Sequence, residues 1–121
     1  MANPFVHVEL MTTDLDRAKD FFGKLFGWKL EDATGAGDMT YIMIKVGQGT
    51  GGGIMKNPIP NAGSQWLAYV EVDDVQAATA KAKSLGGKVM KDATEVKGMG
   101  SFSIITDPTG AMLGLWETKK A

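Results

Sequence analysis

The sequence predicts an α+β fold in which two β-α-β-β-β modules follow one another along the chain. Three observations carry this prediction: an internal repeat, the same succession of strand and helix patterns in each copy, and a proline-containing linker between the copies. A chain of 121 residues is long enough to bury a sizeable core in one domain. We therefore expect a single domain over residues 1–121, with module one at 4–56, a linker at 57–64 and module two at 65–118.

The repeat becomes visible when the sequence is shifted by 60 positions, which places residues 6–46 on residues 66–106 with nine identities. Chance similarity would give about two or three matches over such a length. The nine pairs are Asp14 with Asp74, Ala18 with Ala78, Leu25 with Leu85, Gly27 with Gly87, Asp32-Ala33-Thr34 with Asp92-Ala93-Thr94, Met39 with Met99, and Ile44 with Ile104. We interpret the repeat as a duplication.

The first strand of each module is predicted at Phe5–Met11 and at Trp66–Val72, where apolar and β-branched residues dominate. Successive side chains of a strand point to opposite faces, so His7 and Glu9 share one face and the neighbouring valines share the other. The repeat predicts that the residues on the face of His7 and Glu9 in module two are Leu67, Tyr69 and Glu71.

Each first strand leads into a predicted amphipathic helix. Thr13-Asp14 and Asp73-Asp74 supply N-cap oxygens, and glycines at Gly27 and at Gly86-Gly87 end the helices. The first helix is expected to bury a single apolar face made of Ala18, Phe21, Phe22, Leu25 and Phe26. The second helix is expected to bury Val75, Ala78, Ala82 and Leu85.

Three further strands are predicted in each module. They are Trp28–Glu31, Met39–Val46 and Gly52–Lys56 in module one, and Lys88–Lys91, Gly100–Thr106 and Met112–Glu117 in module two. The Gly51-Gly52-Gly53 run lacks the strand-loop-helix context of a phosphate loop, and we interpret it as a backbone bend or bulge. A ferredoxin-like sandwich is the alternative fold, which the closing strand of each module and the repeat disfavour.

Composition narrows the range of functions. Thirteen basic residues against 14 acidic ones give a net charge of −1 with no basic stripe, so nucleic acid is not an expected partner. The chain has no cysteine, which excludes disulfides, thiolate metal sites and cysteine nucleophiles, and fits a reducing compartment. No stretch approaches the length of a membrane span. We therefore expect a soluble cytoplasmic protein with no membrane partner.

Strand alternation also predicts a face directed away from the helices. In module one this face carries Tyr41, Met43, Lys45 and Met55, and in module two it carries Ser101, Ser103, Ile105 and Trp116. The opposite face, directed at the helices, is expected to carry Ile42, Ile44, Phe102 and Ile104. Methionine, tyrosine and tryptophan with a few polar groups suit an apolar or aromatic small molecule. The alternative is that these side chains fill the interior of the fold or a dimer interface.

His7 and Glu9 are the best candidates for chemistry because their side chains leave the same face of one strand. A carboxylate on a partly dry face has its pKa raised toward the range of a general base, so we predict Glu9 as the catalytic base. Tyr69, or alternatively Tyr41, is predicted to donate a hydrogen bond to a developing oxyanion. The alternatives are that Glu9 only bonds to neighbouring strands or solvent and that His7 is structural.

Four motifs follow one another along the chain: Thr-Asp-Leu-Asp-Arg-Ala, Leu-Phe-Gly-Trp, Gly-Gly-Gly-Ile-Met and Asp-Pro-Thr-Gly-Ala-Met-Leu-Gly-Leu-Trp. Their order resembles that of the vicinal-oxygen-chelate superfamily of glyoxalases, bleomycin resistance proteins and extradiol dioxygenases, and within it small bacterial proteins related to lactoylglutathione lyase. The resemblance covers nearly the whole chain. It implies a glyoxalase-like curved, incomplete barrel whose concave face holds the site, and it implies a homodimer, in some relatives with the site at the subunit interface.

Metal-using members of this superfamily carry four ligand positions, which the resemblance places on His7, Gly53, Leu67 and Gly114. Leucine and glycine side chains have no lone pair to donate, and the chain has one histidine in total, so we expect no metal and no cofactor. A metal on His7, Glu9 and a further carboxylate such as Glu71 is the alternative. The residues predicted to contact a small-molecule ligand are His7, Tyr41, Met43, Met55, Leu67 and Trp116.

The resulting prediction is a metal-independent enzyme related to lactoylglutathione lyase that acts on a small carbonyl or aromatic substrate. The alternative is a non-catalytic protein of the bleomycin-resistance type, which sequesters an antibiotic or another small ligand.

Overall fold

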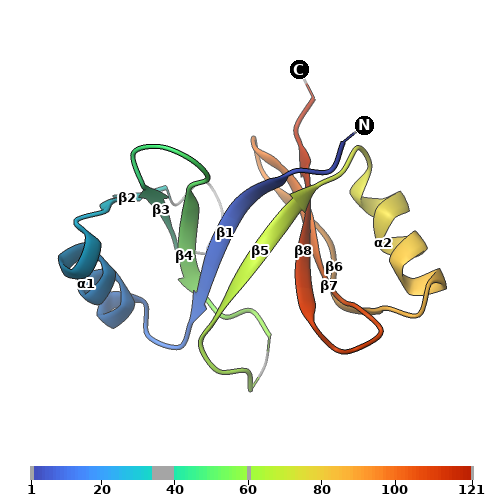
Figure 1. Cartoon of the computed structure of the whole chain (residues 1–121), viewed down its shortest axis with the longest axis horizontal. Coiled ribbons are helices and arrows are strands. Elements are labelled where there is room, and N and C mark those ends of the chain that lie inside the picture. Colours follow the sequence, from blue (N-terminus) through green and yellow to red (C-terminus); the bar gives the residue numbers. More distant parts are fainter. Residues whose placement is uncertain (1, 34–39, 60, 121) are drawn as a thin grey trace. The chain divides into compact units, whose positions relative to one another are not determined.

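The computed structural model of this chain describes residues 2–33, 40–59 and 61–120, which form eight strands and two helices (Figure 1). The chain divides into two compact units. The N-terminal unit is His7–Leu67, and the C-terminal unit joins the residues before His7 to those from Ala68 onward. The predicted α+β class with two β-α-β-β-β modules is confirmed. The prediction of a single domain over the whole chain stays a prediction.

The N-terminal unit contains β1, α1, β2, β3 and β4. Their bounds are Phe5–Thr12 for β1, Leu15–Phe26 for α1, Lys29–Asp32 for β2, Tyr41–Lys45 for β3 and Gly52–Lys56 for β4. The strands lie in the order β2-β3-β4-β1, with β4 parallel to β1 and antiparallel to β3. Asp14 caps α1 by accepting a hydrogen bond from the backbone N–H of Arg17 at 3.1 Å, and Gly27 ends the helix with a φ of 65°.

The C-terminal unit repeats this plan with β5, α2, β6, β7 and β8, although residues 65–67 at the start of β5 belong to the N-terminal unit. Their bounds are Gln65–Glu71 for β5, Val75–Ser84 for α2, Lys88–Val96 for β6, Gly100–Thr106 for β7 and Met112–Thr118 for β8. The strands lie in the order β5-β8-β7-β6, with β8 parallel to β5 and antiparallel to β7. Asp74 caps α2 by accepting a hydrogen bond from the backbone N–H of Ala77 at 3.0 Å.

The core of the N-terminal unit lies between its sheet and α1. Leu10, Ile42, Ile44 and Ile54 are buried there, and the side chains packed against them include Ala18, Phe22, Trp28 and Leu30. The prediction that Ile42 and Ile44 point at the helix is confirmed. The side chains at the alternate positions of β1, β3 and β4 therefore share the opposite face of this sheet.

The two faces of β7 are opposite to those predicted. Ser103, expected to point away from the helix, contacts α2 through a hydrogen bond of 2.8 Å between its Oγ and Oγ1 of Thr79. Phe102, expected to point at the helix, lies edge-on to the ring of Tyr69 with centroids 6.2 Å apart. The prediction for Ser101, Ser103 and Ile105 was therefore wrong, as was the prediction for Phe102 and Ile104.

The faces of β7 are reversed because the offset between the two copies of the repeat changes within module two. In β3, Met43 pairs with Gly53, whereas in β7 the residue paired with the corresponding Gly114 is Ile104. The offset is thus 61 rather than 60 by β7, so Ile44 and Ile104 are identical without being structurally equivalent. Irregularities of register in β6, between Val89 and Thr94, accompany the change. A slip of one residue moves every side chain of a strand to the other face.

The repeat positions Thr34 and Met39, and the predicted start of a strand at Met39, lie outside the described residues.

The apolar residues of α1 do not all face the sheet, contrary to the prediction of a single buried face. Ala18 and Phe22 pack on the core, but Phe21, Leu25 and Phe26 are 58%, 55% and 56% exposed. The apolar stripe of α1 is wider than the strip of sheet that the helix contacts. In α2, Val75 is buried as predicted, whereas Leu85 lies beyond the helix end and is 69% exposed.

Candidate functional site

A hydrogen-bonded group of three side chains lies in the N-terminal unit, on the face of its sheet opposite α1. We call it the His7–Tyr41–Glu9 trio. His7 and Glu9 come from alternate positions of β1, and Tyr41 is the first residue of β3. Nε2 of His7 lies 2.5 Å from the hydroxyl oxygen of Tyr41, and the two rings are stacked with centroids 6.2 Å apart. The Tyr41 side chain also hydrogen-bonds to Glu9, which is 4% exposed.

Gly53 makes the space in which the Tyr41 phenol lies. It is a paired residue of β4, with Glu9 beside it on β1 and Met43 beside it on β3. A Cβ built on Gly53 would overlap the hydroxyl and ring atoms of Tyr41. Gly52 and Gly53 continue the ladders of β4 without a shift of register, so the predicted bend or bulge at this point was wrong. Gly53 instead allows the Tyr41 side chain to lie close against the backbone of β4.

Burial sets the protonation states of the two ring-bearing residues of the trio. Burial, together with the charge of Glu9 and the hydrogen bond to it, raises the pKa of Tyr41 far above its usual value of 10.0. Burial lowers the pKa of His7 below its usual value of 6.5. A neutral imidazole with its proton on Nε2 donates to the Tyr41 oxygen, and the Tyr41 hydroxyl then donates to the Glu9 carboxylate. In this arrangement each of the three side chains has a hydrogen-bond partner, and Glu9 is the anion.

The protonation of His7 can be followed directly because the chain contains one histidine. We expect the midpoint of its imidazole titration, measured by proton NMR of the folded protein, to lie below the ordinary 6.5. The unfolded chain binds a proton at His7 below about pH 6.5, whereas the folded chain binds it only at lower pH. The free energy of unfolding should therefore fall as the pH decreases from about 6.5 toward the folded pKa.

The matched control for this titration is His7→Asn, which retains a polar side chain that does not titrate. Its free energy of unfolding, measured by urea denaturation, should lack the contribution that the wild-type protein loses over the same pH interval. A midpoint at or above 6.5 in the folded wild-type protein would contradict the burial of a neutral imidazole in the trio.

Two of the predicted ligand contacts share the face of the trio. Met43 follows Tyr41 by two positions on β3 and is half-buried. Met55, on β4, pairs with Tyr41 of β3 and is 3% exposed. Leu67 is buried on β5 at 1% exposure. Glu9, Tyr41, Met43 and Met55 thus come together from three adjacent strands, as alternation predicts. Their role in binding a ligand stays a prediction.

The C-terminal unit places Tyr69 over a glycine in a similar way. Tyr69 pairs with Gly114 between β5 and β8, and a Cβ on Gly114 would overlap the Tyr69 ring. Tyr69 is 4% exposed. On the same face, the indole N–H of Trp116 donates to the Thr118 hydroxyl at 3.0 Å, and that hydroxyl donates to the Glu71 carboxylate at 2.9 Å. The pairing of a tyrosine ring with a glycine in each unit was not predicted from the sequence, because it depends on which strands are neighbours.

The residues at the inherited ligand positions do not fit a divalent metal ion. The space in front of Gly53 is filled by Tyr41, and the space in front of Gly114 is filled by Tyr69. Leu67 offers no lone pair. Within residues 2–33, 40–59 and 61–120, no group of three or more histidine, cysteine, aspartate or glutamate side chains is placed to hold an ion. Divalent transition metals need about three such donors from the protein, so these residues support no chemical step through a metal.

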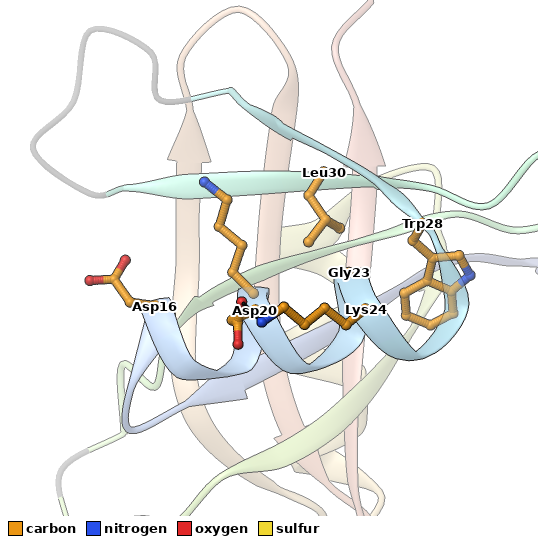
Figure 2. A pocket seen from close by; sticks show the side chains of 7 residues that line it. Asp16, Asp20, Gly23, Lys24, Trp28 and Leu30 are labelled. Carbon is orange, nitrogen blue, oxygen red and sulfur yellow. Dashed lines mark ion pairs between the residues drawn. The ribbon is translucent and has the colours of Figure 1, made fainter.

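Two surface grooves flank α1. Figure 2 shows the smaller one, of about 340 Å³, where the exposed ion pair of Lys24 with Asp20 spans 3.1 Å. An exposed pair one helical turn apart contributes little free energy, and this groove offers no other distinctive chemistry. The larger groove, of about 930 Å³, is lined by Phe21, Phe22, Leu25 and Trp66, and we call it the aromatic groove. Neither groove is lined by a residue of the trio.

Comparison with known sequences identifies related proteins. The family model described as "Glyoxalase/Bleomycin resistance protein/Dioxygenase superfamily" matches residues 5–115. CFP32 of Mycobacterium tuberculosis, whose name gives glyoxylase as a provisional activity, is 37% identical over 119 residues, covering 93% of this chain and 45% of CFP32. The anthracycline biosynthesis protein DnrV of Streptomyces peucetius is 25% identical over 122 residues, covering 89% of this chain and 44% of DnrV. The chain therefore spans less than half the length of these relatives.

Comparison with solved structures gives similar folds. The hypothetical protein BH1468 of Bacillus halodurans C-125 has a TM-score of 0.72 at 12% identity, with 100% of this chain and 98% of that chain covered. The methylmalonyl-CoA epimerase of Mycobacterium tuberculosis has a TM-score of 0.67 at 17% identity, with coverages of 96% and 88%. The epimerase of Streptomyces coelicolor in complex with 2-nitronate-propionyl-CoA has a TM-score of 0.68 at 15% identity, with coverages of 96% and 97%. Identities this low show the fold alone.

Proposed function

We propose that this chain, which belongs to the glyoxalase, bleomycin resistance protein and dioxygenase superfamily, is a metal-independent enzyme related to lactoylglutathione lyase. Its substrate is a small carbonyl or aromatic compound, and its reaction begins with removal of a proton from the carbon next to a carbonyl. The observation that carries this proposal is the buried Glu9 carboxylate, which the Tyr41 hydroxyl holds by a hydrogen bond.

Glu9 is the general base of the proposed reaction. Its carboxylate accepts the proton from carbon, the C–H electron pair forms the new carbon–carbon double bond, and the carbonyl oxygen takes up the negative charge as an enolate. Return of a proton to the opposite face of the same carbon completes an epimerisation. In a substrate with a hydroxyl on that carbon, the hydroxyl proton passes to the enolate oxygen and the proton on Glu9 goes to the former carbonyl carbon, which completes an isomerisation. The name of the similar methylmalonyl-CoA epimerases supports this chemistry, because such an epimerisation exchanges a proton beside a carbonyl.

Tyr41 is a positioning residue in this account. Its hydroxyl fixes the Glu9 carboxylate, and the stacked His7 ring in turn fixes the hydroxyl. Met43 and Met55 supply an apolar wall beside the base, which suits the carbon chain or ring of a substrate. Tyr69 remains the proposed donor to the enolate oxygen, and the role of Glu9 does not depend on that assignment.

The test of the proposed function is hydrogen exchange in heavy water. The probes are methylmalonyl-CoA, and the hemithioacetal that forms from methylglyoxal and glutathione. We expect the wild-type protein to replace the hydrogen beside the carbonyl of at least one probe by deuterium, as followed by loss of its proton NMR signal. Binding of a probe without any exchange above the protein-free rate would contradict the enzyme and favour the sequestering alternative.

The remaining features of the proposal concern partners and location. The ligand is a small molecule, the partner is a second copy of this chain, and the location is the cytoplasm. The net charge of −1 supports the absence of a nucleic-acid partner. No helix in the described part of the chain is long and apolar enough to cross a membrane.

A further inference from the structure

We infer that the aromatic groove is the surface through which a second copy of this chain binds. This inference rests on the homodimer proposed above and adds which surface forms it: the outer side of α1 together with the start of β5. It concerns a different part of the N-terminal unit from the His7–Tyr41–Glu9 trio.

The aromatic groove is a continuous apolar surface that stays open in the single chain. Phe21 and Leu25 of α1 are more than half exposed, at 58% and 55%, and Trp66 of β5 is 44% exposed. The Phe22 ring joins them, edge-on to Trp66 with centroids 5.4 Å apart and edge-on to Phe21 at 4.9 Å. None of the 12 residues of α1 is fully buried. Contiguous exposed apolar surface of this kind marks interaction sites, whereas scattered single residues do not.

The duplicated helix provides an internal comparison. The repeat places Lys81 of α2 at the position of Phe21 and Ala82 at the position of Phe22. Lys81 is exposed, so the fold of this module accepts a charged residue where α1 has an aromatic one. Phe21 is therefore not required by the packing of the helix on its sheet. An exposed apolar residue on the outer face of α1 instead fits a contact with another surface.

The charges around the groove favour a second copy over a highly charged partner. Its rim carries the acidic side chains of Asp14 and Asp20 and the basic side chains of Arg17 and Lys24. A rim with both signs in equal number can meet its own copy across a two-fold axis without net repulsion. Anionic lipid or nucleic acid would instead need an excess of basic side chains.

The experiment compares the dimerisation of three full-length proteins by sedimentation equilibrium over a range of micromolar concentrations. Phe21→Lys introduces the residue of the duplicated helix, and Leu85→Lys makes a matched change at an exposed leucine outside the groove. We expect the wild-type and Leu85→Lys proteins to dimerise alike. The dimer dissociation constant of Phe21→Lys should rise by more than about tenfold, because truncated or charged interface anchors typically cost this much.

Each outcome decides between the claims. A wild-type protein that stays monomeric at about 100 μM, where even weak specific dimers are populated, would overturn the homodimer and this surface together. A wild-type dimer that persists unchanged in Phe21→Lys would overturn this surface and leave the homodimer intact. Circular dichroism checks that each variant is folded. If Phe21→Lys does not fold, Leu25→Gln takes its place, with Leu85→Gln as its control and the same two outcomes.

Discussion

Replacing Glu9 with glutamine is expected to slow deuterium exchange into the reactive probe by at least about a hundredfold, the usual lower bound for a positioned general base. Glutamine has the shape of glutamate and still accepts the hydrogen bond from the Tyr41 hydroxyl through its amide oxygen, but it cannot take up a proton from carbon. Binding of the probe, measured by calorimetry, should change by less than about threefold, because the contact surface is unaltered.

The control for this substitution is Glu95→Gln, which makes the same chemical change at an exposed position of β6. It should leave both exchange and binding unchanged. Exchange that continues at the wild-type rate in Glu9→Gln would remove Glu9 from the reaction. A loss of binding together with exchange would mean that the carboxylate holds the ligand rather than acting as the base.

Adding a single methyl group in Gly53→Ala is expected to disrupt the trio. The new Cβ would overlap the Tyr41 hydroxyl, so the phenol has to leave its hydrogen bonds with His7 and Glu9. Overpacking at a buried site costs about 1–3 kcal/mol, which urea denaturation would register as a lower free energy of unfolding. Exchange activity should fall as well, because Glu9 loses the group that positions it.

A double-mutant cycle shows whether this effect passes through Tyr41. In a Tyr41→Ala background the same Gly53→Ala change no longer meets the phenol, so its cost should shrink to less than about 0.5 kcal/mol. Gly63→Ala serves as the matched control, because a Cβ there meets nothing within 4 Å and the backbone does not require glycine. An equal loss of stability from Gly53→Ala in both backgrounds would contradict the packing of Tyr41 over this glycine.

Local sequence signals predicted most of the fold. The aspartates Asp14 and Asp74 cap the helices as expected, because their oxygens satisfy backbone N–H groups of the first turn. Strands β4 and β7 have the predicted bounds. The faces of β7 could not be predicted by the repeat, because an offset that changes within module two is invisible in a comparison at one fixed shift. The identity of Ile44 with Ile104 supported the wrong register.

The candidate site was predictable only in part. Alternation along β1 places His7 and Glu9 on one face, and alternation along β3 places Tyr41 on the same face of the sheet. The contact among them depends on β4 lying between β1 and β3, with Gly53 of β4 paired to Glu9 on one side and to Met43 on the other. That pairing joins residues more than 30 positions apart, as in the bond of His7 to Tyr41. A single sequence carries no local signal for it.

The central proposal is that Glu9, positioned by Tyr41, performs proton chemistry at this site without the metal ion that metal-using relatives hold. The most direct measurement is elemental analysis of the purified protein for zinc, iron, nickel, cobalt and manganese, repeated on His7→Ala. The account predicts a content far below one ion per chain in both proteins. A stoichiometric ion in the wild-type protein that is lost in His7→Ala would contradict it.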